Sequence, residues 1–256
     1  MTNIIGIIPA RMESSRFPGK PLAKINGIPM VGHVYFRSKM SETLNDVYVA
    51  TCNKEIENYI ASVGGKTIMT SDKHKRASDR VTEAMIKIEK KTGKKTDIVV
   101  MIQGDEPMIY PEMIKEAVKP LIDNKNVMVS NLTALIKSPK EHRDINEIKV
   151  VFDKKNFALY FSREPIPCDR RIKNEKYRYK QVCIIPFTRD MLIKFNELKP
   201  TPLEIKESID MLRLLEHGYK VKMVLTKYDT YSVDTKDDLK NVEQLMKNDK
   251  LINSYP

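Results

Sequence analysis

Short apolar runs alternate along most of this chain with longer amphipathic segments, and this alternation is the feature that most restricts its fold. The apolar runs predict β-strands at residues 3–8, 46–51, 66–70, 97–103, 126–134, 148–152, 182–187 and 220–226. Helical periodicity predicts helices at residues 30–40, 54–63, 78–91, 111–123, 203–217 and 236–247. A repeated order of strand and helix is typical of a mainly parallel sheet with helices on both faces. The predicted fold class is therefore α/β.

The alternation loosens in the second half of the chain. Strand-like runs follow one another over residues 126–187 with few helical patterns between them, which predicts a small antiparallel insertion. Residues 170–180 are charged and aperiodic, and they predict an exposed loop. With 256 residues, the chain is long enough for one domain with a subdomain. We therefore predict a single domain over residues 1–256, with a smaller lobe at 126–187.

Composition and charge argue against several classes of function. The formal charge is +11, but lysines are interspersed with acidic residues and no basic stripe carries aromatic residues, so we predict no nucleic-acid partner. No apolar run is long enough to span a bilayer, and the first strand does not resemble a signal peptide, so we predict no membrane association. Cys52, Cys168 and Cys183 follow no metal-binding spacing. Free thiols are typical of a cytoplasmic protein, which is the predicted location.

The loop after the first predicted strand is rich in groups that bind phosphate. Residues 9–22 read PARMESSRFPGKPL and include two arginines, a lysine, two serines and a glycine. Ligands of open α/β sheets bind at the carboxyl ends of the strands, where this loop lies. Its N–H groups, hydroxyls and cations are the parts of a triphosphate cradle. An exposed basic turn is the alternative, because lysine and arginine are mostly surface residues.

The same loop resembles a known family. Residues 7–22, IIPARMESSRFPGKPL, look like the nucleotide-binding signature of the CMP-Kdo synthetases, which are 3-deoxy-manno-octulosonate cytidylyltransferases. Further motifs match in the same order, and the resemblance covers residues 4–245. These motifs are QGDEPMI at 103–109, KVVFD at 149–153, ALYFSR at 158–163, PLE at 202–204 and VDT at 233–235.

The resemblance implies a Rossmann-like nucleotidyltransferase fold and a homodimer. Its reaction would transfer CMP from CTP to an acidic sugar, with Mg²⁺ as cofactor and pyrophosphate as the leaving group. The family's acceptor is 3-deoxy-manno-octulosonate, and the product would serve lipopolysaccharide or capsule synthesis. The lobe at residues 126–187 would then serve the acceptor or dimerisation. Direct in-line transfer needs no protein nucleophile, which agrees with a sequence that shows no Ser/His or Cys/His arrangement.

The resemblance also assigns residues to the nucleotide, most of them in the first loop. Arg11, Lys20 and Asp105 are the catalytic candidates. Fixed cations such as Arg11 and Lys20 would stabilise the charge that develops on the phosphate oxygens. A solvated surface position is the alternative for both. The nucleotide-binding candidates are Pro9, Ala10, Arg11, Ser15, Arg16, Lys20, Ser78 and Arg80.

Two aspartates are the predicted metal ligands. Asp105 follows a predicted buried strand, and Asp234 follows a strand-like segment near the C-terminus. Carboxylates at two strand ends can converge on one cation, and the resemblance makes both of them Mg²⁺ ligands. Each also has a structural explanation. Asp105 can shape the turn before Pro107, while Asp234 precedes a helix that Thr235 and Asp238 begin with a T-x-x-D capping box.

A further set of residues is assigned to the acceptor by resemblance. Arg163 could form a bidentate pair with the sugar carboxylate, and a structural ion pair is the alternative. Gln103 can equally be a polar residue that ends a strand. Glu204 completes a capping box with Thr201 and so has a structural explanation. The acceptor candidates are Gln103, Arg163, Gln181, Glu204 and Glu207.

Two segments depart from the family pattern. Arg76 and Ala77 in HKRASDR replace the Ser-Gly of a loop that lies against the nucleotide base in the family. The family's H-x-G-I-Y-x-Y becomes QVCIIPF at residues 181–187, so hydrogen-bonding groups of the sugar pocket are lost. Three hypotheses therefore stay open. They are the family's own reaction, the same chemistry on another ulosonic acid or acidic metabolite, and a nucleotide-binding module without catalysis.

Overall fold

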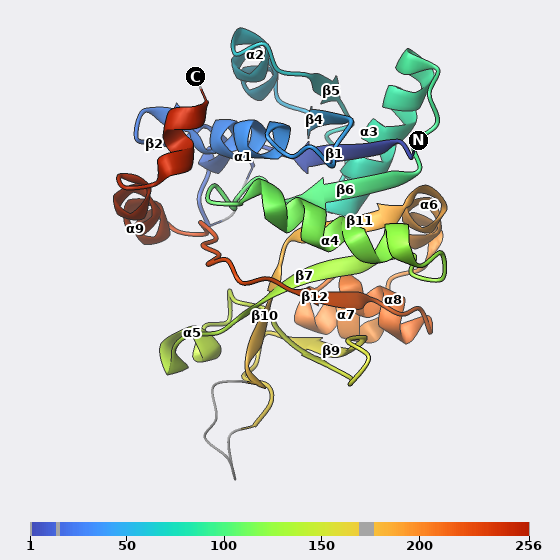
Figure 1. Ribbon diagram of the computed structural model, residues 1–256. Coiled ribbons are helices and arrows are strands. Elements are labelled where there is room, and N and C mark those ends of the chain that lie inside the picture. The colour runs from blue at the N-terminus through green and yellow to red at the C-terminus, as the bar shows by residue number, and fades with distance from the viewer. Residues whose placement is uncertain (1, 14–15, 169–176, 256) are drawn as a thin grey trace. The chain divides into compact units, whose positions relative to one another are not determined.

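The computed structural model of this protein describes residues 2–13, 16–168 and 177–255 (Figure 1). The chain divides into two compact units. The first comprises Met1–Lys115 and Thr230–Pro256, and the second comprises Glu116–Asp229. The predicted smaller lobe, residues 126–187, lies within the second unit, and its part in acceptor binding or dimerisation stays a prediction.

A parallel sheet forms the centre of the first unit. Its strands are β1 (Ile4–Pro9), β4 (Asp46–Thr51), β5 (Thr67–Met69) and β6 (Ile98–Ile102), in the order β6-β1-β4-β5. All three strand pairs are parallel. Every residue of β1 and β6 is buried, as continuous apolar runs predict for strands covered on both faces. The α/β prediction is confirmed.

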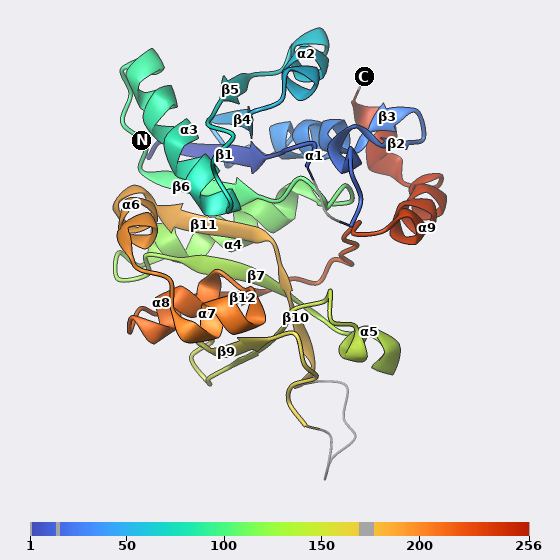
Figure 2. The same cartoon turned by 180° about the vertical axis from the view of Figure 1, so that it is seen from behind.

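Helices cover both faces of this sheet. The helices after the first three strands are α1 (Met30–Lys39), α2 (Lys54–Ser62) and α3 (Ala77–Thr92). Figure 1 and Figure 2, which view the molecule from opposite sides, show α3 on the other side of the sheet from α1. The last helix, α9 (Lys236–Met246), begins with the predicted capping box between Thr235 and Asp238. Short elements complete the unit, namely η1 (Lys20–Leu22), β2 (Lys24–Ile25), β3 (Ile28–Pro29) and η3 (Lys250–Ser254).

The second unit contains the predicted antiparallel sheet. Its strands are β7 (Ser130–Leu135), β8 (Lys149–Phe152), β9 (Ala158–Ser162), β10 (Tyr179–Val182) and β12 (Lys222–Leu225), in the order β12-β7-β10-β8-β9. Only the β12–β7 pair among them is parallel. Helix α4 (Pro111–Asp123) contains the boundary between the units, and α5 (Pro139–Arg143) and α6 (Arg189–Glu197) were not predicted.

Several predicted elements differ from the observed ones. The strand predicted at 182–187 is interrupted at Cys183, which separates β10 from β11 (Ile184–Thr188). The helix predicted at 203–217 is divided into α7 (Pro202–Glu207) and α8 (Met211–Glu216), because Ser208 adopts a left-handed conformation with φ of 54°. The prediction of an exposed loop at 170–180 is wrong at its C-terminal end, because Lys180 is buried in β10. Residues 169–176 lie outside the described residues.

The described residues include no helix that is both long enough and apolar enough to cross a membrane.

Candidate functional site

A pocket of about 290 Å³ lies in the first unit, at the carboxyl ends of β1 and β6. The first loop, the segment that leads into α3 and the loop after β6 form its walls. Six predicted nucleotide-binding residues line it, together with two residues predicted to bind the metal or the acceptor. They are Pro9, Ala10, Arg11, Arg16, Lys20 and Arg80, with Asp105 and Gln103. Ser15 lies outside the described residues.

The backbone brings the two strand ends close together. A Cβ atom on Gly104 would lie only 3.2 Å from the carbonyl oxygen of Pro9. Glycine at this position therefore lets the loop after β6 approach the end of β1. Because β1 and β6 are adjacent parallel strands, their carboxyl ends meet at the same edge of the sheet. This places Asp105 beside the first loop.

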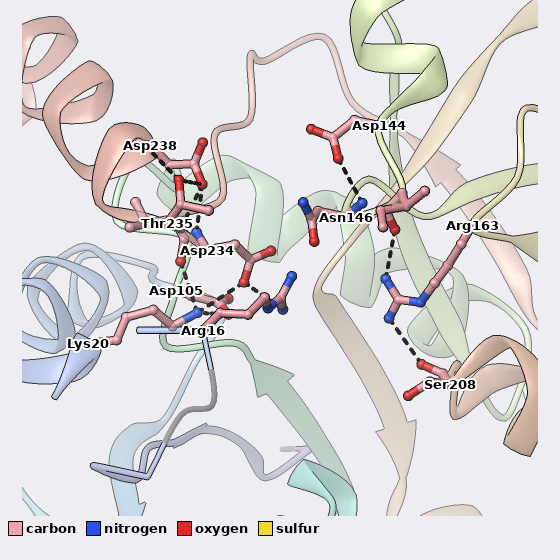
Figure 3. Close-up of polar contacts among 12 residues, drawn as sticks. Arg16, Lys20, Asp105, Asp144, Asn146, Arg163, Ser208, Asp234, Thr235 and Asp238 are labelled. Atoms are coloured by element: carbon pink, nitrogen blue, oxygen red, sulfur yellow. Dashed lines mark hydrogen bonds and ion pairs between the residues drawn. The ribbon is translucent and has the colours of Figure 1, made fainter. Parts of the chain in front are cut away.

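Lys20 lies at the centre of the polar contacts in the pocket (Figure 3). Its Nζ donates to Asp105 Oδ2 at 2.9 Å, to the carbonyl oxygen of Val233 at 2.9 Å and to Asp234 Oδ1 at 3.3 Å. These acceptors use all three N–H groups of the ammonium. Burial lowers the pKa of Lys20, but the two carboxylates outweigh that effect and raise the pKa above its ordinary value. Lys20 is therefore charged at neutral pH.

The turn before α9 fixes the second carboxylate. Asp238 Oδ2 accepts hydrogen bonds from the N–H groups of Asp234 and Thr235, at 3.1 and 2.8 Å. The N–H of Val233 donates to the carbonyl oxygen of Asp105 at 2.9 Å. These bonds leave the Asp234 carboxylate directed toward Lys20 (Figure 3). Asp234 can therefore both precede helix α9 and direct its carboxylate toward Lys20, so its structural role does not exclude a role in the site.

The two arginines of the first loop differ in their contacts. Arg16 Nη2 pairs with Asp234 Oδ1 at 2.9 Å, although about half of the Arg16 side chain is exposed. Arg11 is exposed and donates a long hydrogen bond, 3.5 Å, to the carbonyl oxygen of His74. The structure therefore gathers Arg16, Lys20 and both aspartates, and it leaves Arg11 at the pocket wall without a carboxylate partner among the described contacts.

The segment that departs from the family pattern also lines the pocket. Arg76 turns onto its own helix, where Nη2 and Nε contact the carboxylate of Asp79 at 2.6 and 3.2 Å. Arg80 is buried and donates through Nη1 to the hydroxyl of Thr70. Its buried Nη2 has no hydrogen-bond partner among the residues that the structure describes. Ser78 is buried inside α3 and does not line the pocket.

In the second unit, Arg163 and Glu207 are brought together. Glu207 accepts from the N–H of Arg163 and the hydroxyl of Ser162, both at 2.9 Å. Burial raises the pKa of Glu207, but these bonds and one from Tyr160 outweigh it and lower the pKa. The Arg163 guanidinium donates to the carbonyl oxygens of Glu207 and Ile145, at 2.8 and 2.9 Å. It also donates to the carbonyl oxygen of Ser208, at 3.2 Å (Figure 3). The alternative for Arg163 is a structural ion pair with an acidic side chain. The guanidinium does have structural partners, but they are backbone carbonyl groups.

Gln181 and Glu204 are buried in the second unit, and each one bonds to another side chain there. Gln181 is buried, and its Nε2 donates to Asn131 Oδ1. The carboxylate of Glu204 is buried against the guanidinium of Arg213, with an Nε–Oε2 distance of 2.7 Å, and it completes the predicted capping box with Thr201. Both contacts give Glu204 a structural role. They do not support a role in acceptor binding, which stays a prediction.

Sequence reasoning missed two features of the pocket. The carbonyl of Val233 accepts from Lys20, and no side-chain pattern announces a backbone acceptor. His74 lines the pocket and contacts Glu83 through Nε2. Burial raises the pKa of Glu83, but hydrogen bonds from Lys87, Ser71 and His74 lower it to about 2. The His74–Glu83 pair bridges a loop and a helix, so helical periodicity does not reveal it.

Known proteins share both the sequence and the fold of this chain. The sequence profile of the cytidylyltransferase family matches residues 5–248. The 3-deoxy-manno-octulosonate cytidylyltransferase of Geotalea uraniireducens is 41% identical, over 95% of this chain and 99% of that relative. The enzyme of the same name from Thermodesulfovibrio yellowstonii is also 41% identical, over 98% of each chain.

A solved structure extends the likeness to three dimensions. A CMP:2-keto-3-deoxy-manno-octonic acid synthetase complexed with CTP aligns with a TM-score of 0.87 and 37% identity, over 96% of this chain and 99% of that chain. The resemblance to the CMP-Kdo synthetases that the motifs indicated is thereby confirmed. This chain belongs to the cytidylyltransferase family, and it is a nucleotidyltransferase enzyme.

Proposed function

We propose that this enzyme transfers CMP from CTP to 3-deoxy-manno-octulosonate and releases pyrophosphate. The observation that carries the proposal is that Lys20 and Asp105, which line a pocket together with further cations, converge with Asp234. The Geotalea and Thermodesulfovibrio relatives support the acceptor, and the CTP complex of the similar structure supports the nucleotide. The same resemblance leads us to propose a cytoplasmic homodimer whose product serves lipopolysaccharide or capsule synthesis.

The proposed reaction is a direct in-line transfer. A hydroxyl oxygen of the acceptor forms a bond to the α-phosphorus of CTP and loses its proton. The bond from that phosphorus to the bridging oxygen of the β-phosphate breaks, and pyrophosphate leaves with the electron pair. Negative charge grows on the phosphate oxygens, and Arg11, Arg16 and Lys20 are the cations that would stabilise it. Arg80, whose Nη2 has no partner within residues 2–13, 16–168 and 177–255, would donate to the nucleotide.

Asp105 and Asp234 are the residues that would hold Mg²⁺. Their oxygens already share one cation, Lys20 Nζ, at 2.9 and 3.3 Å, so both carboxylates face the same position. Mg²⁺ prefers oxygen ligands and is commonly bound by one or two carboxylates together with substrate phosphates. The donor set therefore fits. Bound Mg²⁺ would supply positive charge against the phosphate oxygens.

A second acceptor is the alternative, and one observation favours it. Ile185 and Phe187 stand where the family pattern has tyrosines, and both are buried in the second unit. Gln181, in place of the family's histidine, is bonded to Asn131. Apolar side chains cannot hydrogen-bond sugar hydroxyls, so loss of those groups changes which acceptor is preferred. Another ulosonic acid or acidic metabolite is therefore the alternative acceptor.

Pyrophosphate release across a panel of acids separates the two acceptors. The purified enzyme is mixed with CTP and Mg²⁺, and each acid is supplied in turn at the same concentration. We expect the highest kcat/KM with 3-deoxy-manno-octulosonate. Clear turnover of another acid beside none with octulosonate would replace the first acceptor with the second. CTP binding in calorimetry with no turnover of any acid would support a nucleotide-binding module without catalysis.

A further inference from the structure

The ammonium of Lys20 occupies the space that the two candidate metal ligands share. Asp105 Oδ2 and Asp234 Oδ1 both accept from Nζ, at 2.9 and 3.3 Å, and the carbonyl oxygen of Val233 takes the remaining donor. An ammonium has three donors and no acceptor. Lys20 therefore cannot donate to a phosphate oxygen without giving up at least one of these partners.

The charges in this cluster are balanced as the structure stands. Asp105 and Asp234 contribute two negative charges, and Lys20 and Arg16 contribute two positive ones. Lys20 and Asp234 are largely shielded from water, with side chains only 12% and 14% exposed. A divalent cation that approaches the two carboxylates would meet an ammonium already bound to both. Without nucleotide, this cluster therefore attracts a divalent cation only weakly, because Lys20 and Arg16 already neutralise the two carboxylates.

Lys20 is the mobile partner in this arrangement. The carboxylates are attached to structure that is fixed by backbone bonds: Val233 N–H donates to the Asp105 carbonyl, and the Asp238 carboxylate holds the N–H of Asp234. The Lys20 ammonium is carried on a flexible four-carbon stem and can change position by rotamer changes alone. A triphosphate in the pocket would offer it acceptor oxygens of higher negative charge.

We propose that Lys20 is the internal counter-ion of Asp105 and Asp234 in the nucleotide-free enzyme, and that the divalent metal site forms only when a triphosphate draws Lys20 away. The inference rests on the proposed function, because it takes CTP as the triphosphate and these aspartates as the metal ligands. Lys20 then acts in two successive positions, first on the carboxylates and then on phosphate. Withdrawal of its charge leaves two carboxylates side by side, which a divalent cation neutralises. By linkage, bound metal strengthens triphosphate binding by the same factor.

The test is metal affinity in the absence of nucleotide, with Mn²⁺ as the probe. Free Mn²⁺ is measured by electron paramagnetic resonance during titration of the nucleotide-free protein. We expect Lys20→Met to bind Mn²⁺ at least about tenfold more tightly than the native protein, because the competing charge is gone. Lys20→Arg, which keeps the charge, should bind as weakly as the native protein.

Matched controls separate this effect from a general change of charge or fold. Lys24→Met removes an exposed lysine four positions further along and should leave Mn²⁺ affinity unchanged. Lys20→Gln keeps a donor for the carboxylates without the charge, so it should bind more tightly even if Lys20→Met does not fold. Asp105→Asn added to Lys20→Met should remove the gain.

Two different failures can be told apart. If nucleotide-free Lys20→Met and Lys20→Gln bind Mn²⁺ no better than the native protein, while CTP still recruits Mn²⁺ to the native protein, the counter-ion inference is wrong and the proposed function stands. If native protein recruits no Mn²⁺ with CTP and releases no pyrophosphate with any acid, the proposed function itself is wrong.

Discussion

At the scale of single residues, Lys20 and Arg80 differ in how many of their donors have a hydrogen-bond partner. Lys20 has an acceptor for each of its three donors. Arg80, also in the pocket wall, is buried and has no partner for Nη2 among the described residues. A buried donor without a partner costs about 1–3 kcal/mol. We therefore propose that a bound nucleotide completes the hydrogen bonding of Arg80.

This contrast leads to a prediction for Arg80. Arg80→Met keeps an unbranched side chain in α3 but removes the guanidinium. We expect CTP affinity, measured by calorimetry, to fall about tenfold to a hundredfold, which corresponds to the loss of one hydrogen bond to a charged group. Lys91→Met, at an exposed position of the same helix, is the matched control and should bind CTP normally. Native-like affinity in a folded Arg80→Met protein would remove Arg80 from the nucleotide site.

At the scale of elements, the C-terminal segment holds Asp234 in place. An apolar cluster joins α9 to the first loop and to the residue before Asp234, through Phe17, Met108, Val233, Val242 and Met246. After α9 the chain returns to α1. There, Arg37 is fully buried and pairs through Nη2 with Asp249, and its Nη1 donates to the carbonyl of Ile109 at 3.2 Å. This buried ion pair fastens the end of the chain to the core of the first unit.

Because this ion pair is buried, we expect a single substitution of Asp249 to lower the stability of the protein strongly. Asp249→Asn would leave the Arg37 charge buried without a counter-ion, and loss of one partner of a buried pair typically costs about 3–5 kcal/mol. We expect the free energy of unfolding, measured by urea titration with far-UV circular dichroism, to fall by about that amount. Asp237→Asn is the control, because the Asp237 side chain is 93% exposed, and its effect should be below about 0.5 kcal/mol. Equal stability of the two variants would show that the Arg37–Asp249 pair contributes little.

At the scale of the whole molecule, periodicity predicted the fold class and most elements of the first unit. Strands buried on both faces, such as β6, produce continuous apolar runs that are easy to recognise. Predictions failed where one residue changes the backbone direction, as at Ser208, since its left-handed conformation leaves no mark on hydrophobic periodicity. They also failed at Lys180, a charged residue that is buried because Glu141 and Glu147 pair with it.

The candidate site could be predicted in part for the same physical reason. The rule that strand ends converge was enough to expect Asp105 and the first loop together, because β1 and β6 are neighbours. The position of Lys20 between the two aspartates depends on contacts of residues 85 and 214 positions apart in sequence. Local patterns carry no information about such distances. Residues of the second unit, such as Glu204, could be assigned a helix-capping role from spacing, and that assignment is confirmed.

We propose that CMP transfer depends on the carboxylates that contact Lys20. The most direct measurement is pyrophosphate release from CTP, Mg²⁺ and 3-deoxy-manno-octulosonate by native protein, Asp105→Asn and the exposed-site control Asp237→Asn. We predict steady turnover by the native and control proteins and a loss of at least about a hundredfold in Asp105→Asn, with an unchanged circular dichroism spectrum. Near-native turnover by Asp105→Asn would contradict it.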